Sequence, residues 1–381
     1  MFSMFFGAGN IAFPLKVGQL AGNQSVPAIL GLLLTAVGVP FLGLLAIILY
    51  EGDYRAFFAR IGRIPGFLVA FFLLIILGPI GAVPRCIALS YSTIKMYNPA
   101  LSVVIFSLIS CLFMYIAAYK KSRIVGLLGA VLSPILVVSL AIIIIKGMLI
   151  HPTASASTLD AISMFKFGLY EGYNTMDLLA AFFFSSVVIT GLRQSSESRG
   201  RDTWLVARDA LWASIIGAVL LGLVYAGFVL VASYYGSALA MVPAEVLLGT
   251  VAQTILGPIG GLLVGLAVVL TCFTTALALA SVFAEFLHTE VSSQRISYHI
   301  SLLITVVITF VFANFTFSEI VAMLDPILIV LYPVLLVLTV MNILHKLCGV
   351  SMVKIPVMIA TIASIIWYYA PQVLTHVGVG G

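Results

Sequence analysis

Hydrophobic residues in this chain occur in long runs that short polar or charged connections separate. Because a helix that crosses a bilayer needs about 20 consecutive apolar residues, each run of that length predicts one transmembrane span. The predicted spans are residues 1–19, 26–50, 66–91, 99–119, 122–147, 171–192, 209–235, 261–287, 296–313, 318–344 and 353–371. The pattern therefore predicts an all-α polytopic membrane protein with about eleven transmembrane helices.

The composition supports this prediction. Of the 381 residues, 62% are hydrophobic and only 8% are charged, whereas an average soluble domain has roughly 25% charged residues. The net charge of +5 does not indicate nucleic-acid binding, because the 18 basic residues are scattered between apolar runs. The four cysteines and five histidines are also dispersed, without metal-ligand spacing. We therefore expect the lipid bilayer as a partner, no nucleic acid, no cofactor and no enzymatic activity.

The basic residues are distributed unevenly between the two ends of the predicted spans. Alternate connections hold 13 of the 18, namely Arg55, Arg60, Arg63, Lys120, Lys121, Arg123, Arg193, Arg199, Arg201, Arg208, Arg295, Lys346 and Lys354. Cytoplasmic connections are the ones enriched in Lys and Arg. We therefore expect a cell-membrane protein whose N-terminus is cytoplasmic and whose C-terminus, after an odd number of spans, lies outside.

The chain divides into two halves of five spans each. A polar stretch, HPTASASTLD, separates residues 1–150 from residues 165–345, and an additional transmembrane helix follows at 350–372. Because five is odd, the second half enters the membrane from the opposite side, which is typical of inverted-repeat transporters. Residues 236–260 are too apolar for an exposed loop, and they predict either an outer helical hairpin across the protein or a short re-entrant segment.

Both halves begin with a span that contains poor helix-forming residues. The first contains GAGNIAFP, which includes Gly7, Gly9 and Asn10. The second contains EGYNTMD, where the interrupting residues are Gly172, Asn174, Thr175 and Asp177. Broken spans at corresponding positions indicate a binding site, because the free N–H groups suit a carboxylate and the free carbonyls, with the amide oxygen of Asn10, suit a cation. A glycine-rich face for close helix packing is the alternative explanation.

Other polar residues inside apolar runs are candidates for ion chemistry. Thr274 and Thr275 can ligate a small hard cation or can hydrogen-bond the carbonyls of their own helix. Asp177 and Asp325 indicate an ion or proton path, although Asp325 precedes a proline and can instead cap a helix. Arg85 can act as a gate, can pair with a carboxylate such as Glu171 or Asp177, or can extend toward the membrane surface.

Several motifs resemble the bacterial branched-chain amino acid:cation symporters, the leucine/isoleucine/valine carrier family. They are FFGAGNIAFP (5–14), LGPIGAVPR (77–85), EGYNTMDLLAA (171–181), CFTTALALASVFAEF (272–286) and LYP (331–333). The resemblance implies a five-plus-five inverted-repeat transporter fold with broken spans one and six, located in the bacterial inner membrane. The chain departs from the family pattern in that it starts inside span one and stops after span eleven.

The same resemblance implies roles for individual residues. Gly7, Ala8 and Gly9 would hold the substrate carboxylate, and Asn10 would hold a cation. Thr274 and Thr275 would join carbonyls of the Ser3–Phe6 stretch at a second sodium site. The other residues predicted to bind substrate lie at the second break and are Tyr173, Asn174 and Thr175.

Two hypotheses of function follow for a small-molecule substrate. The first is a secondary active symporter that imports leucine, isoleucine and valine with Na⁺, or alternatively with H⁺. The second is a proton-coupled carrier of another small neutral amino acid, in which Asp177 and Asp325 form the proton relay.

Overall fold

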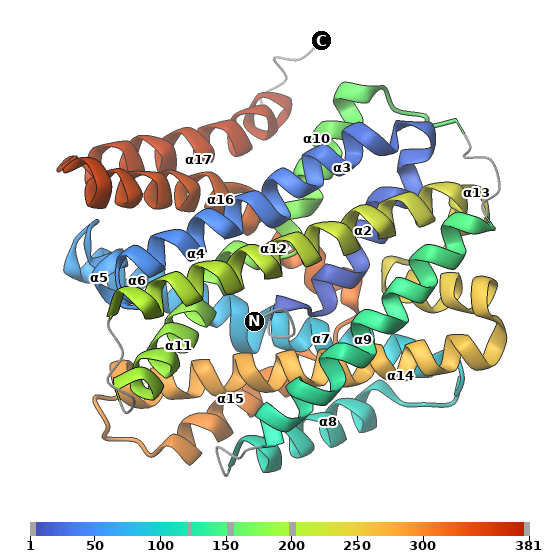
Figure 1. The fold of residues 1–381 in the computed structure, drawn as a ribbon, viewed down its shortest axis with the longest axis horizontal. Coiled ribbons are helices and arrows are strands. Elements are labelled where there is room, and N and C mark those ends of the chain that lie inside the picture. Colours follow the sequence, from blue (N-terminus) through green and yellow to red (C-terminus); the bar gives the residue numbers. More distant parts are fainter. Residues whose placement is uncertain (1–4, 120–123, 151–155, 198–202, 377–381) are drawn as a thin grey trace.

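A computed structural model describes residues 5–119, 124–150, 156–197 and 203–376, and within these ranges every regular element is a helix (Figure 1). The elements are α2 (Ala8–Ala21), η1 (Gly22–Gln24), α3 (Ser25–Leu33), η2 (Leu34–Gly38), α4 (Val39–Leu49), α5 (Tyr54–Ala59), α6 (Arg63–Ile75), η3 (Ile76–Ile80), α7 (Ala82–Lys95), α8 (Val103–Tyr119), α9 (Ile124–Leu149), α10 (Ala161–Asn174), α11 (Asp177–Glu197), α12 (Thr203–Tyr234), α13 (Gly236–Leu239), η4 (Ala244–Val246), α14 (Leu247–Phe286), η5 (Leu287–Val291), α15 (Tyr298–Phe312), α16 (Phe317–Cys348) and α17 (Lys354–His376).

Within the described residues each predicted span overlaps a helix or consecutive helices, although the helix pair that contains the predicted span 171–192 begins earlier, at Ala161. Five stretches are long and apolar enough to cross a membrane, namely Ala8–Leu49, Arg63–Lys95, Ala207–Tyr234, Ala244–Val291 and Phe317–Cys348. The bent pair α10–α11 makes a sixth, and shorter apolar helices cover the remaining spans. The first stretch holds two predicted spans, because α2 and the α3–α4 pair run in succession. The predicted all-helical membrane fold is confirmed.

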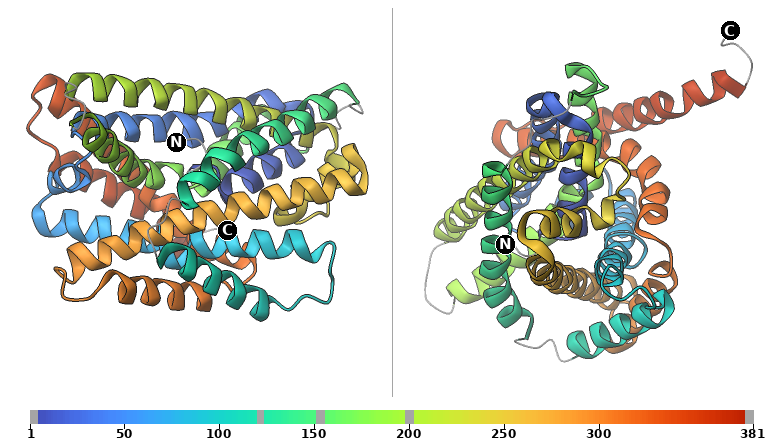
Figure 2. Two further views of the ribbon diagram at one scale, coloured as in Figure 1. Left: turned by 60° about the horizontal axis from the view of Figure 1, so that its bottom comes forward. Right: turned by 90° about the vertical axis from the view of Figure 1, so that its right-hand side faces the viewer.

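The outer faces of several helices are apolar where a soluble protein would be polar. Leu112, Phe113 and Ile116 of α8 are exposed, and so are Ile359 and Ile366 of α17. Large contiguous apolar surfaces mark contact with a membrane or a partner. These faces are therefore the lipid-facing surface of the bundle. Figure 2 shows the arrangement of the helices from two further directions.

The described parts of the connections predicted to be cytoplasmic lie at one end of the bundle. Arg60 Nη2 lies 3.2 Å from His345 Nδ1, and Arg193 Nη2 lies 2.9 Å from a carboxylate oxygen of Glu51. At the opposite end, Gln19 donates to carbonyl oxygens around α13. In Figure 1, α5 lies at the left end and α13 at the right. The segment 236–260 belongs to this second end and contains α13, a non-helical turn at 240–243, η4 and the start of α14, which has a break at Gly257.

Close helix packing explains several of the glycines. A Cβ atom at Gly31 would lie 2.0 Å from the Phe165 carbonyl oxygen, so α3 and α10 approach backbone to backbone. A Cβ atom at Gly172 would lie 2.0 Å from Thr35 Oγ1. Gly172 is therefore a packing glycine within α10, and the prediction that it interrupts the helix is wrong.

Candidate functional site

The first break in helical structure lies just before α2. Phe6 and Gly7 are not helical, and α2 begins at Ala8, so the break precedes most of the predicted stretch 7–10. Asn10 Oδ1 accepts a hydrogen bond from the Gly7 N–H at 2.9 Å. The first N–H groups of α2 have no partner within their own helix, which makes this terminus suited to a negative group.

The second break separates α10 from α11 at Thr175 and Met176. The two helices are bent by 40° relative to each other. Met176 has φ +62°, a left-handed conformation that non-glycine residues adopt at a cost of about 1–3 kcal/mol. The Thr175 hydroxyl donates to the Gly172 carbonyl at 2.9 Å, which satisfies one of the carbonyls at the end of α10.

A buried hydrogen-bond network joins the two breaks. Asn10 Nδ2 donates to both carboxylate oxygens of Asp177, at 2.8 and 2.9 Å. The Tyr225 hydroxyl of α12 donates to Asp177 Oδ2 at 2.8 Å and also contacts Asn10 Nδ2. All three side chains are buried. The network fixes the start of α2 against the start of α11, although 167 residues separate Asn10 from Asp177.

A small cavity of about 30 Å³ lies where the two breaks meet. Its polar side includes Gly7, Ala8, Gly9, Asn10, Arg85, Thr175, Asp177 and Thr275, and its apolar side includes Phe5, Leu77, Ala82, Cys86, Met176, Ala180, Phe184 and Leu279. In this conformation the space holds water-sized molecules only, so an amino acid can bind here only after the lining helices have separated. The lining is therefore mixed, with charged, polar and glycine residues as well as small, branched and aromatic apolar groups.

Arg85 of α7 borders this central cavity and is almost fully buried, at 1% exposure. Its Nη2 donates to the Asn174 carbonyl oxygen at 2.8 Å, at the C-terminal end of α10. Among the described residues it forms no ion pair, so the expected pairing with Glu171 or Asp177 is not present. Glu171 instead pairs with Lys16, at 2.6 Å.

Of the two adjacent threonines, only Thr275 borders the cavity. Thr275 Oγ1 donates to the Phe6 carbonyl oxygen at 3.3 Å, which joins α14 to the first break. Thr274 Oγ1 donates to the Thr271 carbonyl of its own helix at 2.8 Å, as the alternative explanation predicts. The earlier part of the predicted sodium site, from Ser3 to Met4, lies outside the described residues.

A second cavity, of about 330 Å³, lies toward the α13 end of the bundle and is lined by Phe13, Lys16, Gln19, Glu171, Asn174, Ala244, Phe317, Ser318, Val321, Ala322 and Asp325. Asn174 Nδ2 donates to Asp325 at 2.9 Å, so Asp325 links α16 to α10 and does not cap a helix. Asp177 and Asp325 line different cavities. Tyr173, predicted to contact substrate, packs against the Tyr332 ring with centroids 4.6 Å apart and does not border the central cavity.

Comparison with known proteins identifies the family. The model of the family described as branched-chain amino acid transport protein matches residues 1–377. The chain belongs to this family. This transport protein is 30% identical to a Staphylococcus saprophyticus protein named as a branched-chain amino acid carrier, covering 96% of this chain and 85% of that one. It is 29% identical to the branched-chain amino acid permease BraB of Bacillus subtilis, covering 91% and 79%.

Two solved structures share the fold of this transport protein. One is MhsT in complex with L-phenylalanine, with a TM-score of 0.58, 14% identity and 96% coverage of both chains. The other is MHP1, a nucleobase-cation-symport-1 family transporter in a closed conformation with bromovinylhydantoin bound, with a TM-score of 0.59, 11% identity and coverage of 97% and 92%. The fold is therefore a membrane transporter fold, and the family is one of transporters and not of enzymes.

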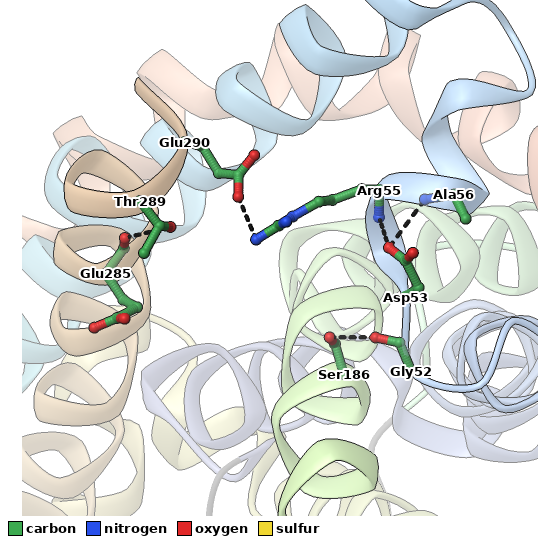
Figure 3. A network of polar contacts seen from close by, with 8 residues as sticks. All are labelled: Gly52, Asp53, Arg55, Ala56, Ser186, Glu285, Thr289 and Glu290. Atoms are coloured by element: carbon green, nitrogen blue, oxygen red, sulfur yellow. Dashed lines mark hydrogen bonds and ion pairs between the residues drawn. The ribbon is translucent and has the colours of Figure 1, made fainter. Parts of the chain in front are cut away.

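A larger cavity of this transport protein, about 510 Å³, lies next to the central one along the same helices. It is lined by Phe183, Ser186 and Val187 of α11 and by Ala278, Ser281, Val282 and Glu285 of α14. These residues lie beside and after Phe184 and Leu279, which line the central cavity on the same two helices. Arg55 of α5 also lines it and forms an ion pair with Glu290 of η5, while Ser186 donates to the Gly52 carbonyl (Figure 3). The cavity lies at the end of the bundle that carries the basic connections.

Proposed function

We propose that this protein is a secondary active symporter that imports leucine, isoleucine and valine together with Na⁺. The observation that carries the proposal is the central cavity between two broken helices. Backbone N–H groups and Arg85 suit the carboxylate of an amino acid, and Asp177 suits its ammonium group. Much of the remaining lining is small or apolar. Leu77, Phe184 and Leu279 suit a branched apolar side chain, and the family of the chain supports this substrate class.

Na⁺ is proposed as the co-transported ion, bound where the first break meets α14. The Phe6 carbonyl oxygen and the Thr275 hydroxyl lie 3.3 Å apart there. A Cβ atom at Gly7 would lie 3.0 Å from Thr275 Cγ2, so the two segments are in close contact. Carbonyl and hydroxyl oxygens are the ligands that hard cations prefer. Asn10 is proposed as a further cation ligand. Its Oδ1 accepts the hydrogen bond from the Gly7 N–H with one lone pair, and the second lone pair would bind the ion.

The transport path is proposed to run from the 330 Å³ cavity to the 510 Å³ cavity through the central site. Because the basic connections surround the larger cavity, we assign that end to the cytoplasm of the bacterial inner membrane. The N-terminus is then cytoplasmic. We also infer that residues 1–150 and 165–345 are inverted repeats, since each half places a broken helix first and the two breaks meet at the site.

Uptake of radiolabelled leucine into proteoliposomes tests this function. An inward Na⁺ gradient should drive accumulation above equilibrium, and unlabelled isoleucine and valine should compete. Replacement of Na⁺ by choline should abolish accumulation, and a proton gradient alone should not restore it. Accumulation driven by protons in choline buffer would replace Na⁺ by H⁺ as the coupling ion, and leucine entry without any gradient dependence would contradict symport.

The two adjacent threonines give a matched pair for the ion site. Thr275→Ala removes a hydroxyl that faces the Phe6 carbonyl. We expect the Na⁺ concentration for half-maximal uptake to rise about tenfold, because the loss of one such polar contact costs about 1.4 kcal/mol. Thr274→Ala removes a hydroxyl that bonds its own helix, so the Na⁺ dependence should stay within about twofold. Equal effects of the two substitutions would remove Thr275 from the ion site.

The ion pair between Arg55 and Glu290 is expected to hold the larger cavity partly closed. Arg55 is 61% exposed, and exposed pairs contribute about 0–1 kcal/mol, so Arg55→Gln should increase opening by up to about fivefold. Opening is measured as the labelling rate of a cysteine placed at Ser281, in a background where the exposed Cys348 is replaced by serine.

Arg193→Gln is the control for this measurement. It breaks the pair between Arg193 and Glu51 at the same end of the bundle, but neither residue lines the cavity. Labelling at position 281 should therefore be unchanged. An equal rise in both variants would show that general loosening of this end, and not the Arg55 contact, controls access.

A further inference from the structure

Arg85 is a buried cation whose hydrogen-bonding capacity is only partly used. Its Nη2 has the Asn174 carbonyl as a partner, whereas Nε and Nη1 have no hydrogen-bond partner among the described residues. An arginine side chain offers five N–H donors. Leaving buried charged donors without acceptors is strongly unfavourable, so an acceptor from outside the chain is expected at this position.

Aromatic rings fix the position of the guanidinium group. Its central carbon lies 5.1 Å from the centroid of the Phe13 ring and 5.8 Å from that of Phe317. The rings attract the cation but provide no strong hydrogen-bond acceptor. A Cβ atom at Gly9 would lie 2.7 Å from Arg85 Nη2, so the guanidinium group sits directly against the start of α2. The charge therefore borders the central cavity beside the start of α2, whose first N–H groups have no partner within their own helix.

The charges that line this cavity match those of a zwitterion. Arg85 and Asp177 are the two charged residues in the lining, with opposite signs and no ion pair between them among the described residues. We propose that the Arg85 guanidinium group binds the α-carboxylate of the substrate, together with the N–H groups at the start of α2. This inference rests on the proposed function and gives Arg85 a direct role in recognising α-amino acids over analogues without a carboxylate.

Equilibrium binding to the purified protein tests the proposal with two probes, L-leucine and L-leucinol. Leucinol keeps the ammonium group and the side chain but has a hydroxyl group in place of the carboxylate. The wild-type protein should prefer leucine by at least about tenfold, because hydrogen bonds between charged groups are the stronger ones. In Arg85→Gln the leucine affinity should fall about 10- to 50-fold, whereas the leucinol affinity should change by less than about threefold.

Arg85→Lys and Arg295→Gln complete the experiment. Lysine keeps the charge without the planar fork, so discrimination should be intermediate, and this variant also serves if Arg85→Gln does not fold. Arg295 is exposed on a connection, and its substitution should leave both affinities unchanged. Unchanged discrimination in a folded Arg85 variant, or an equal loss for both probes, would overturn the proposal. Absence of leucine binding to the wild-type protein would instead contradict the proposed function itself.

Discussion

Substitution of Asp177 by asparagine should lower the initial rate of leucine uptake by about 1,000-fold. The carboxylate accepts hydrogen bonds from Asn10 and Tyr225 and is the negative charge in a cavity that also contains Arg85. Asparagine keeps the shape but removes that charge, and it places a second amide against the amide of Asn10. Each hydrogen bond to a charged group contributes about 1.5–3 kcal/mol, so weakening those from Asn10 and Tyr225 accounts for a loss of this size. The measurement is uptake normalised to the amount of protein in the membrane.

Two further variants separate the charge from the hydrogen bonds around it. Tyr225→Phe removes one hydrogen bond while Asn10 still donates to both carboxylate oxygens, so about a tenfold loss is expected. Asp160→Asn removes an exposed carboxylate before α10 and should have no effect. Near-normal uptake by Asp177→Asn would mean that neither the network nor the charge is needed for transport.

Substitution of Gly9 by alanine should raise the KM for leucine by about 100-fold. The new methyl group would lie 2.7 Å from Arg85 Nη2 and 3.1 Å from the Cα and carbonyl oxygen of Thr175. The Thr175 contacts are to backbone atoms at the second break, which cannot move without shifting α11, so the guanidinium group and both breaks are displaced. Extra atoms in a packed interior cost about 1–3 kcal/mol. The cavity is small enough that the substrate position should be lost.

Gly217→Ala is the control, because a Cβ atom at this position of α12 meets nothing within 4 Å. Its stability should be equal or slightly higher, since alanine favours helix more than glycine does. KM and protein yield are measured for both variants. If Gly9→Ala transports with the wild-type KM, the first break is not close to the bound substrate.

Sequence patterns located the helices well but located the breaks only approximately. Hydrophobic runs define spans because the bilayer requires about 20 apolar residues, irrespective of what lies next to them. The exact break depends on which backbone groups find partners. Gly172 is helical and packs against Thr35. The second break lies instead at Thr175 and Met176. Nothing in the sequence indicates that Met176 adopts a left-handed conformation.

Some of the site residues could be predicted from the sequence, and others could not. Glycines, an asparagine and an aspartate in apolar runs are visible in the sequence, because polar groups in a membrane are expensive. Tyr225 and Phe317 look like ordinary members of apolar helices, and Phe13, although it belongs to the motif at 5–14, carries no local signal of its contact with Arg85. Tyr225 reaches Asp177 and the two rings reach Arg85 only because distant helices pack together.

The sequence by itself determined the membrane class, the approximate positions of the apolar spans and the two segments near which helix formation fails. These properties follow from local composition and periodicity, which act along the chain, whereas the family was indicated by the resemblance of particular motifs. Tertiary structure alone decided which of two adjacent threonines faces the first break, that Asp177 and Asp325 line separate cavities, and that Arg85 keeps unused donors beside the central site. The physical reason is that direction and pairing of buried polar groups depend on contacts between helices far apart in sequence.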